Sequence, residues 1–138
     1  MRLITVAASL TAASIAFSVT GCGAIDSGSP FTFNGTLTLQ SYDGYSTGTN
    51  GDCYGRGGYD DINEGTGVTV YNAKGEVVAV GRLGPGTFSS LYSGCSFAFS
   101  VTDVPDGDSF YQIEVSHRGK INKSVEDAKN GSTSLTLD

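Results

Sequence analysis

The sequence has no tryptophan, one histidine and three cysteines among its 138 residues, and each scarcity excludes a class of site. A Ser-His-Asp arrangement needs a histidine as its base, so only His117 could serve in one. A structural zinc site usually takes four Cys or His ligands, more than Cys53, Cys95 and that one histidine supply. A chain this small without tryptophan also has little room for a substrate cleft. We therefore expect no enzymatic activity, no cofactor and no metal.

Basic residues are also scarce, with eight Lys and Arg against 14 Asp and Glu and a formal net charge of −6. Loss of Arg2 with an N-terminal leader would bring that charge near −7. An acidic surface repels nucleic-acid phosphates and anionic lipid head groups. The composition therefore argues against nucleic acid as a partner and against electrostatic attachment to a membrane.

The N-terminus has no apolar run of the length that a membrane span needs, but it has the pattern of an export signal. Arg2 supplies a positive charge, and residues 3–19 are uncharged and mostly apolar or small. Serines and threonines dilute this run, whereas a span takes about 20 predominantly apolar residues. The pattern predicts a cleaved signal peptide.

Residues 19–22, VTGC, resemble the lipobox of bacterial lipoproteins, whose cysteine is joined to a lipid before cleavage. The resemblance implies a lipoprotein signal peptide at 1–21, lipidation of Cys22 and a lipidated tether at 22–30. The protein would then be exported to the outer face of the bacterial cytoplasmic membrane, in the cell envelope, and the lipid would attach it to the membrane. An ordinary secretory peptide cleaved after Ala24 is the alternative, and it also exports the chain.

The remaining cysteines, Cys53 and Cys95, form a pair if Cys22 is lipidated or removed. Disulfides are the default for paired cysteines in an oxidising compartment. The chain-entropy account gives a loop of this length about 4 kcal/mol of stabilisation at most. We predict a Cys53–Cys95 disulfide.

Alternation of apolar and polar residues with a period of two runs through residues 31–138, which we expect to form one domain. The alternation is clear in FTFNGTLTL at 31–39, CSFAFSV at 95–101 and FYQIEVSH at 110–117. Such alternation is typical of strands with one buried face. It predicts an all-β fold, an antiparallel β-sandwich of about seven strands with one disulfide.

Two shorter patterns add a hairpin and a helix. GVTVYNAKGEVVAVGRL at 67–83 indicates a β-hairpin with Lys74 and Gly75 at its turn. NKSVEDAKNG at 122–131 offers Ser124 as a helix N-cap and Gly131 just past the end. We expect at most one short helix, at this position.

Residues 67–83 and FAFSVTDVPDGDSFYQIEVSHRG at 97–119 resemble the carboxypeptidase-regulatory or prealbumin-like β-sandwich. The similarity lies in residues that shape turns and core, which are Val104, Pro105, Gly107, Phe110, Val115 and Gly119. With the lipobox and the C-x-G-x-G-G-Y-x-D-I pattern that starts at Cys53, the chain is also similar to small exported actinobacterial lipoproteins of uncharacterised function. These resemblances imply an Ig-like or prealbumin-like sandwich and no catalytic residue, and the 41–65 insertion departs from the sandwich family.

The stretch 41–65, rich in Gly, Tyr and Asp, is the candidate functional segment. Its glycines suggest a phosphate loop, but residues 67–71 predict a strand where that motif needs a helix. Its carboxylates suit calcium, yet Asp and Gly are also the ordinary residues of turns, so calcium binding at 43–64 stays open. Tyrosines among small polar residues are typical of binding loops. The alternative is that these tyrosines cover the end of the domain.

We therefore predict that Tyr54, Tyr59, Asp60 and Asp61 bind a protein or glycan partner. Two other interpretations stay open. A small envelope hydrolase would use His117, although its place after Ile113 and Val115 more often marks a half-buried residue that caps the core. A purely structural envelope lipoprotein would have no ligand.

Overall fold

The computed structural model describes residues 28–91, 94–131 and 133–138. The predicted signal peptide at 1–21, Cys22 and most of the predicted tether at 22–30 lie outside these residues. Among the described residues, no helix is long and apolar enough to cross a membrane.

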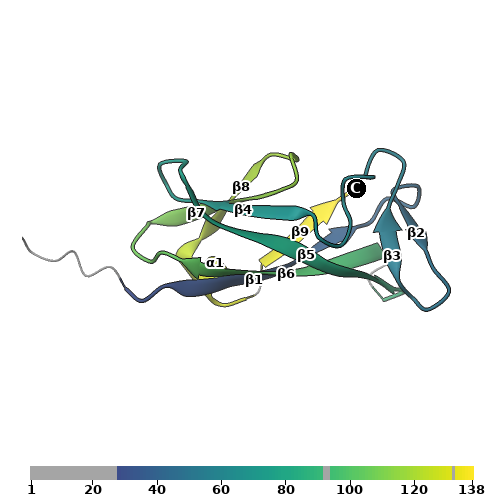
Figure 1. Ribbon diagram of the computed structural model, residues 1–138, viewed down its shortest axis with the longest axis horizontal. Coiled ribbons are helices and arrows are strands. Elements are labelled where there is room, and N and C mark those ends of the chain that lie inside the picture. Colours follow the sequence, from purple (N-terminus) through teal and green to yellow (C-terminus); the bar gives the residue numbers. More distant parts are fainter. Residues whose placement is uncertain (1–27, 92–93, 132) are drawn as a thin grey trace, which may run out of the picture.

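The described chain is built almost entirely of strands (Figure 1). In chain order the elements are β1 (Phe31–Leu39), β2 (Tyr45–Thr47), β3 (Cys53–Gly55), β4 (Gly67–Tyr71), β5 (Val77–Ser89), β6 (Gly94–Val104), β7 (Phe110–Val115), β8 (Lys120–Ser124), α1 (Val125–Lys129) and β9 (Thr133–Leu137). The predicted all-β class is therefore confirmed, with a single short helix in the part of the chain that the structure describes.

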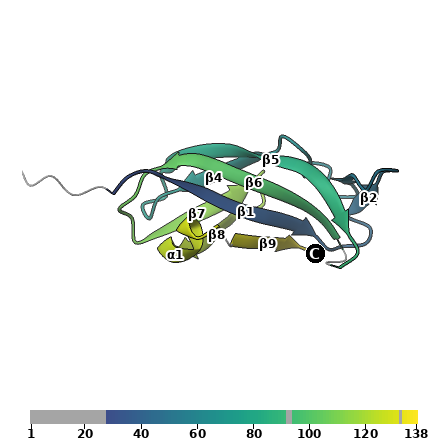
Figure 2. The same ribbon diagram turned by 90° about the horizontal axis from the view of Figure 1, so that it is seen from below.

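Seven strands form one continuous sheet in the order β8-β7-β4-β5-β6-β1-β9, and β2 and β3 form a separate two-stranded hairpin. The sheet curls, so that β7, β8 and α1 lie on one side of the interior and β1, β5 and β6 on the other (Figure 2). The two edge strands approach each other, because Ile121 of β8 and Leu135 of β9 line the same small cavity.

Two details differ from the predicted antiparallel sandwich. The main strands form one hydrogen-bonded ladder and not two separate sheets, because β4 pairs with both β5 and β7. The β1–β9 pair is parallel. Parallel neighbours need a long crossover. Here the chain forms all the strands from β2 to β8 and then α1 before β9 returns beside β1.

The inner face of the sheet follows the predicted alternation. Cys95, Phe97, Phe99 and Val101 of β6 are all buried. Tyr111, Ile113 and Val115 of β7, which alternate along the strand, are buried as well. The alternation is less regular in β5, where Val77 and Val80 are exposed next to a register shift in the β4–β5 pair.

The helix forms where its capping residues predict it. The Ser124 side chain accepts a hydrogen bond from the backbone N–H of Asp127 at 3.1 Å, and Gly131 follows the helix with a φ of +68°. Lys129 in the last turn pairs with Asp106 at 2.7 Å. This contact attaches α1 to the turn before β7.

Candidate functional site

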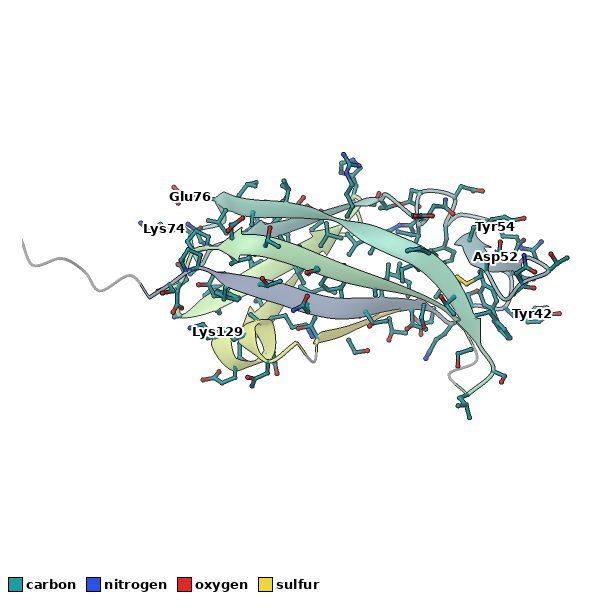
Figure 3. The ribbon with its side chains drawn as sticks, turned by 60° about the horizontal axis from the view of Figure 1, so that its bottom comes forward. Tyr42, Asp52, Tyr54, Lys74, Glu76 and Lys129 are labelled. Atoms are coloured by element: carbon teal, nitrogen blue, oxygen red, sulfur yellow. A yellow bond between two sulfur atoms is a disulfide. The ribbon has the colours of Figure 1, made fainter. Side chains whose placement is uncertain are left out.

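The β2–β3 hairpin and its flanking loops occupy one end of the molecule, and the described chain begins near the other end (Figure 1). Figure 3 shows Tyr42, Asp52 and Tyr54 at the hairpin end and Lys74, Glu76 and Lys129 at the opposite end. The predicted binding loop therefore lies at the end of the domain remote from residue 28.

A disulfide fixes this hairpin to the main sheet. Cys53 of β3 and Cys95 of β6 are joined, with Cα atoms 5.8 Å apart, as predicted. The backbone N–H of Phe88 donates to the Gly51 carbonyl oxygen at 2.9 Å, and a β-bridge joins Asp52 to Thr87. The hairpin is thus attached covalently to β6 and through backbone hydrogen bonding to β5.

Two of the four predicted binding residues, Tyr59 and Asp61, take part in contacts within the domain. The Tyr59 hydroxyl donates to the backbone oxygen of Asp138 at 2.8 Å, and its half-buried ring packs against the core. The Arg118 guanidinium lies 4.8 Å from the centre of that ring. The same guanidinium forms a two-point ion pair with Asp61, with Nε 3.0 Å from Oδ2, and donates to the Gly58 carbonyl at 2.6 Å.

This pairing changes the acidity of Asp61. The hydrogen bond from Arg118 lowers the pKa of the carboxyl group below its usual value, and burial opposes the shift. The carboxylate is therefore held in its charged form. Arg118 fastens the 57–61 turn to the β7–β8 turn, so the contacts of Tyr59 and Asp61 support the loop's shape.

The other two predicted residues, Tyr54 and Asp60, face solvent. Tyr54 is 51% exposed on β3. Asp60 is exposed and accepts one long hydrogen bond, 3.4 Å from the Gly58 N–H. These two side chains are free to meet a partner, whereas Tyr59 and Asp61 have neighbours of their own.

The structure adds a groove that the sequence did not reveal, with a volume of about 340 Å³. We call it the aromatic groove, and it is lined by Tyr42, Tyr45, Ser46, Thr47, Arg56 and Phe88. The rings of Tyr45 and Phe88 lie 6.0 Å apart at an interplanar angle of 33°. Phe88 comes from the end of β5, outside 41–65, and no local motif marked it as part of this surface.

His117 is not the half-buried cap that its sequence position favoured. β7 ends at Val115, and Ser116 turns the chain with a φ of +55°, so His117 lies exposed in the β7–β8 turn. Within the described residues its imidazole makes no hydrogen bond to a serine or a carboxylate. The described residues also contain no group of three or more His, Cys, Asp or Glu side chains placed to hold a metal ion.

Comparisons with protein-family models, with curated proteins and with solved structures found no match to this chain. The resemblances to the carboxypeptidase-regulatory sandwich and to exported lipoproteins therefore stay predictions.

Proposed function

We propose that this chain is an exported, lipid-anchored domain of the bacterial cell envelope that binds a protein or glycan partner and is not an enzyme. The binding surface is the hairpin end, made of residues 41–65 and of residues 87–91 at and just after the end of β5. The anchor is a lipid on Cys22.

The observation that carries the proposal is a concentration of exposed apolar side chains at this end. Tyr42 is 86% exposed, Tyr54 51% and Phe88 37%, and Leu91 at the tip of the β5–β6 hairpin is 89% exposed. Exposed apolar groups that gather in one region mark interaction sites, whereas scattered ones do not. The gathering favours a binding module over a purely structural lipoprotein.

The position of the first described residue supports the same proposal. Gly28 lies at the end opposite the hairpin, where Asp106 stands beside it. A lipid only a few residues before Gly28 holds that end near the membrane. The hairpin end then faces away from the bilayer, which is the orientation that a domain needs to reach a partner in the envelope.

A double variant, Tyr42→Ala with Tyr54→Ala, tests the proposal. The purified chain is used to capture partners from an envelope extract, and the double variant should capture at least tenfold less. Both side chains point to solvent, so the melting temperature should not change. Val77→Ala with Val80→Ala is the matched control, because these exposed apolar residues lie on β5 away from the hairpin.

Deletion of the loop segment 54–60 would also test the proposed surface, but point substitutions disturb the domain less. That removal also takes out Gly55, which is buried, and Tyr59, which packs against the core. Equal capture by the wild type and the Tyr42/Tyr54 variant would contradict the proposed surface, as would the absence of any captured partner.

A further inference from the structure

The aromatic groove is preformed in the folded domain. Its two walls are the β2–β3 hairpin, which carries Tyr45, and the end of β5, which carries Phe88. The disulfide links β3 to Cys95, which is the register partner of Phe88 in the β5–β6 pair. Because the disulfide holds the hairpin against the strand that pairs with β5, the groove loses little entropy when it binds, and such preorganisation strengthens binding.

Arg56 is held in place along this groove. Its backbone N–H donates to the Gly44 carbonyl at 2.9 Å, and its side-chain Nε donates to the Tyr45 carbonyl at 3.1 Å. Only one further contact is present among the described residues, at 4.0 Å from Nη2 to Asp43, whose side chain is 92% exposed. The terminal nitrogens of Arg56 therefore remain available as hydrogen-bond donors to a ligand.

The lining combines aromatic rings with hydroxyl groups. Tyr45 and Phe88 present aromatic surface, and Tyr42 extends it into solvent. Ser46, Thr47 and the tyrosines supply hydroxyls that both donate and accept hydrogen bonds. A sugar ring has the complementary surface, with C–H groups on its face and hydroxyls around its edge.

The charges nearby favour a neutral sugar over an acidic one. Asp43 partly offsets Arg56, Asp52 lies in the same hairpin, and the whole chain is acidic. A ligand carboxylate or phosphate would approach against this field. The groove volume of about 340 Å³ is at the small end of the roughly 300–1,000 Å³ of small-molecule sites, so the bound segment is short.

We propose that the aromatic groove binds a short, uncharged segment of a glycan, with the sugar face against Tyr42, Tyr45 and Phe88 and the sugar hydroxyls at Arg56. This inference rests on the proposed function, because it names the partner class for the same end of the domain. It also separates the roles of two exposed tyrosines, since Tyr42 lines the groove and Tyr54 does not.

The test uses the purified protein, with its disulfide intact, on an array of oligosaccharides. The array carries neutral chains of glucose, mannose, galactose, arabinose and N-acetylglucosamine, together with uronic-acid chains. We expect binding to at least one neutral chain and weaker binding to the acidic ones. Titration calorimetry with that neutral chain should show at least a tenfold loss of affinity in Tyr42→Ala and in Arg56→Ala.

Val80→Ala is the matched control, because it removes an exposed apolar side chain from β5 that does not line the groove. Its affinity for the neutral chain should stay within about twofold of the wild type. The glycan inference is overturned if no neutral chain binds, if acidic chains bind more tightly, or if Val80→Ala weakens binding as much as Tyr42→Ala. Capture of a protein that depends on Tyr42, without glycan binding, would overturn this inference and leave the proposed function standing.

Discussion

At the scale of single residues, Arg118 contacts two of the predicted binding residues, Tyr59 and Asp61, and so gives both of them a structural role. Its guanidinium contacts Asp61, the Gly58 carbonyl and the ring of Tyr59. The composition of 41–65 predicted Tyr59 and Asp61 as binding residues, and in the structure both side chains make contacts within the domain. Their neighbour is 57 positions away from Asp61 in the chain, so no motif within the loop could identify it.

The lowered pKa of Asp61 leads to a pH-dependent prediction for Asp61→Asn. A carboxyl whose folded pKa lies below its unfolded value stabilises the fold above about pH 4, and this contribution is lost as the pH falls through the folded pKa. Because the Asp61 side chain is 39% exposed, solvent screens the pair, and we expect a loss of at most about 1 kcal/mol at pH 7.

Urea unfolding of Asp61→Asn at pH 7 and at pH 3 measures this effect. The difference from the wild type should shrink at the lower pH. Asp60→Asn is the control, because the Asp60 side chain accepts only the long hydrogen bond from the Gly58 N–H. This variant should have the stability of the wild type at both pH values. An equal loss at pH 7 and pH 3 would show that the charge of Asp61 is not what stabilises the turn.

At the scale of elements, the hairpin depends on a close approach between β3 and β5. A Cβ atom on Gly86 would lie 2.1 Å from the carbonyl oxygen of Cys53, a backbone atom that cannot move aside easily. β5 and β6 shift register between Leu83 and Gly86. This irregularity, together with the missing side chain, lets the small hairpin lie against the long strand.

Gly86→Ala should therefore destabilise the protein by about 2 kcal/mol, as overpacking of a filled interface does. Gly67→Ala is the control, because a Cβ at Gly67 meets nothing within 4 Å and its φ is not positive. We expect a change within about 0.5 kcal/mol there. Denaturant unfolding of both variants, with the disulfide intact, compares them. Similar losses of stability in the two variants would mean that the close approach of β3 to β5 does not require a glycine at position 86.

At the scale of the whole molecule, the proposed anchor and the proposed binding surface lie at opposite ends. Gly28 lies beside Asp106, which pairs with Lys129, and Figure 3 shows Lys129 at the end of the molecule opposite the hairpin. The acidic charge of the chain provides no attraction to anionic lipids. The membrane attachment that we propose therefore depends on a lipid at Cys22.

Cys22→Ser tests the anchor in bacteria grown with radiolabelled palmitate. We expect the label to disappear from the protein and the protein to leave the membrane fraction, because the variant has no thiol at residue 22 to receive a lipid. Cys53→Ser with Cys95→Ser controls for general effects of cysteine loss and should keep the label. Label retained in Cys22→Ser would rule out lipidation at this residue.

Local patterns were enough to predict the β class, the inner faces of β6 and β7, the disulfide and the α1 cap. Each of these depends on the alternation of neighbouring residues, on a capping side chain a few residues from its target, or on two cysteines left as a pair. Such signals are present in the chain before it folds.

The parallel β1–β9 pair, the contacts of Arg118 and the aromatic groove arise only from the folded arrangement. Leu37 pairs with Leu135, Asp61 pairs with Arg118, and the ring of Tyr45 lies near that of Phe88, all across long stretches of chain. A period-two pattern states which face of a strand is buried and not which strand lies beside it. The shape of the binding end therefore depended on packing between distant segments.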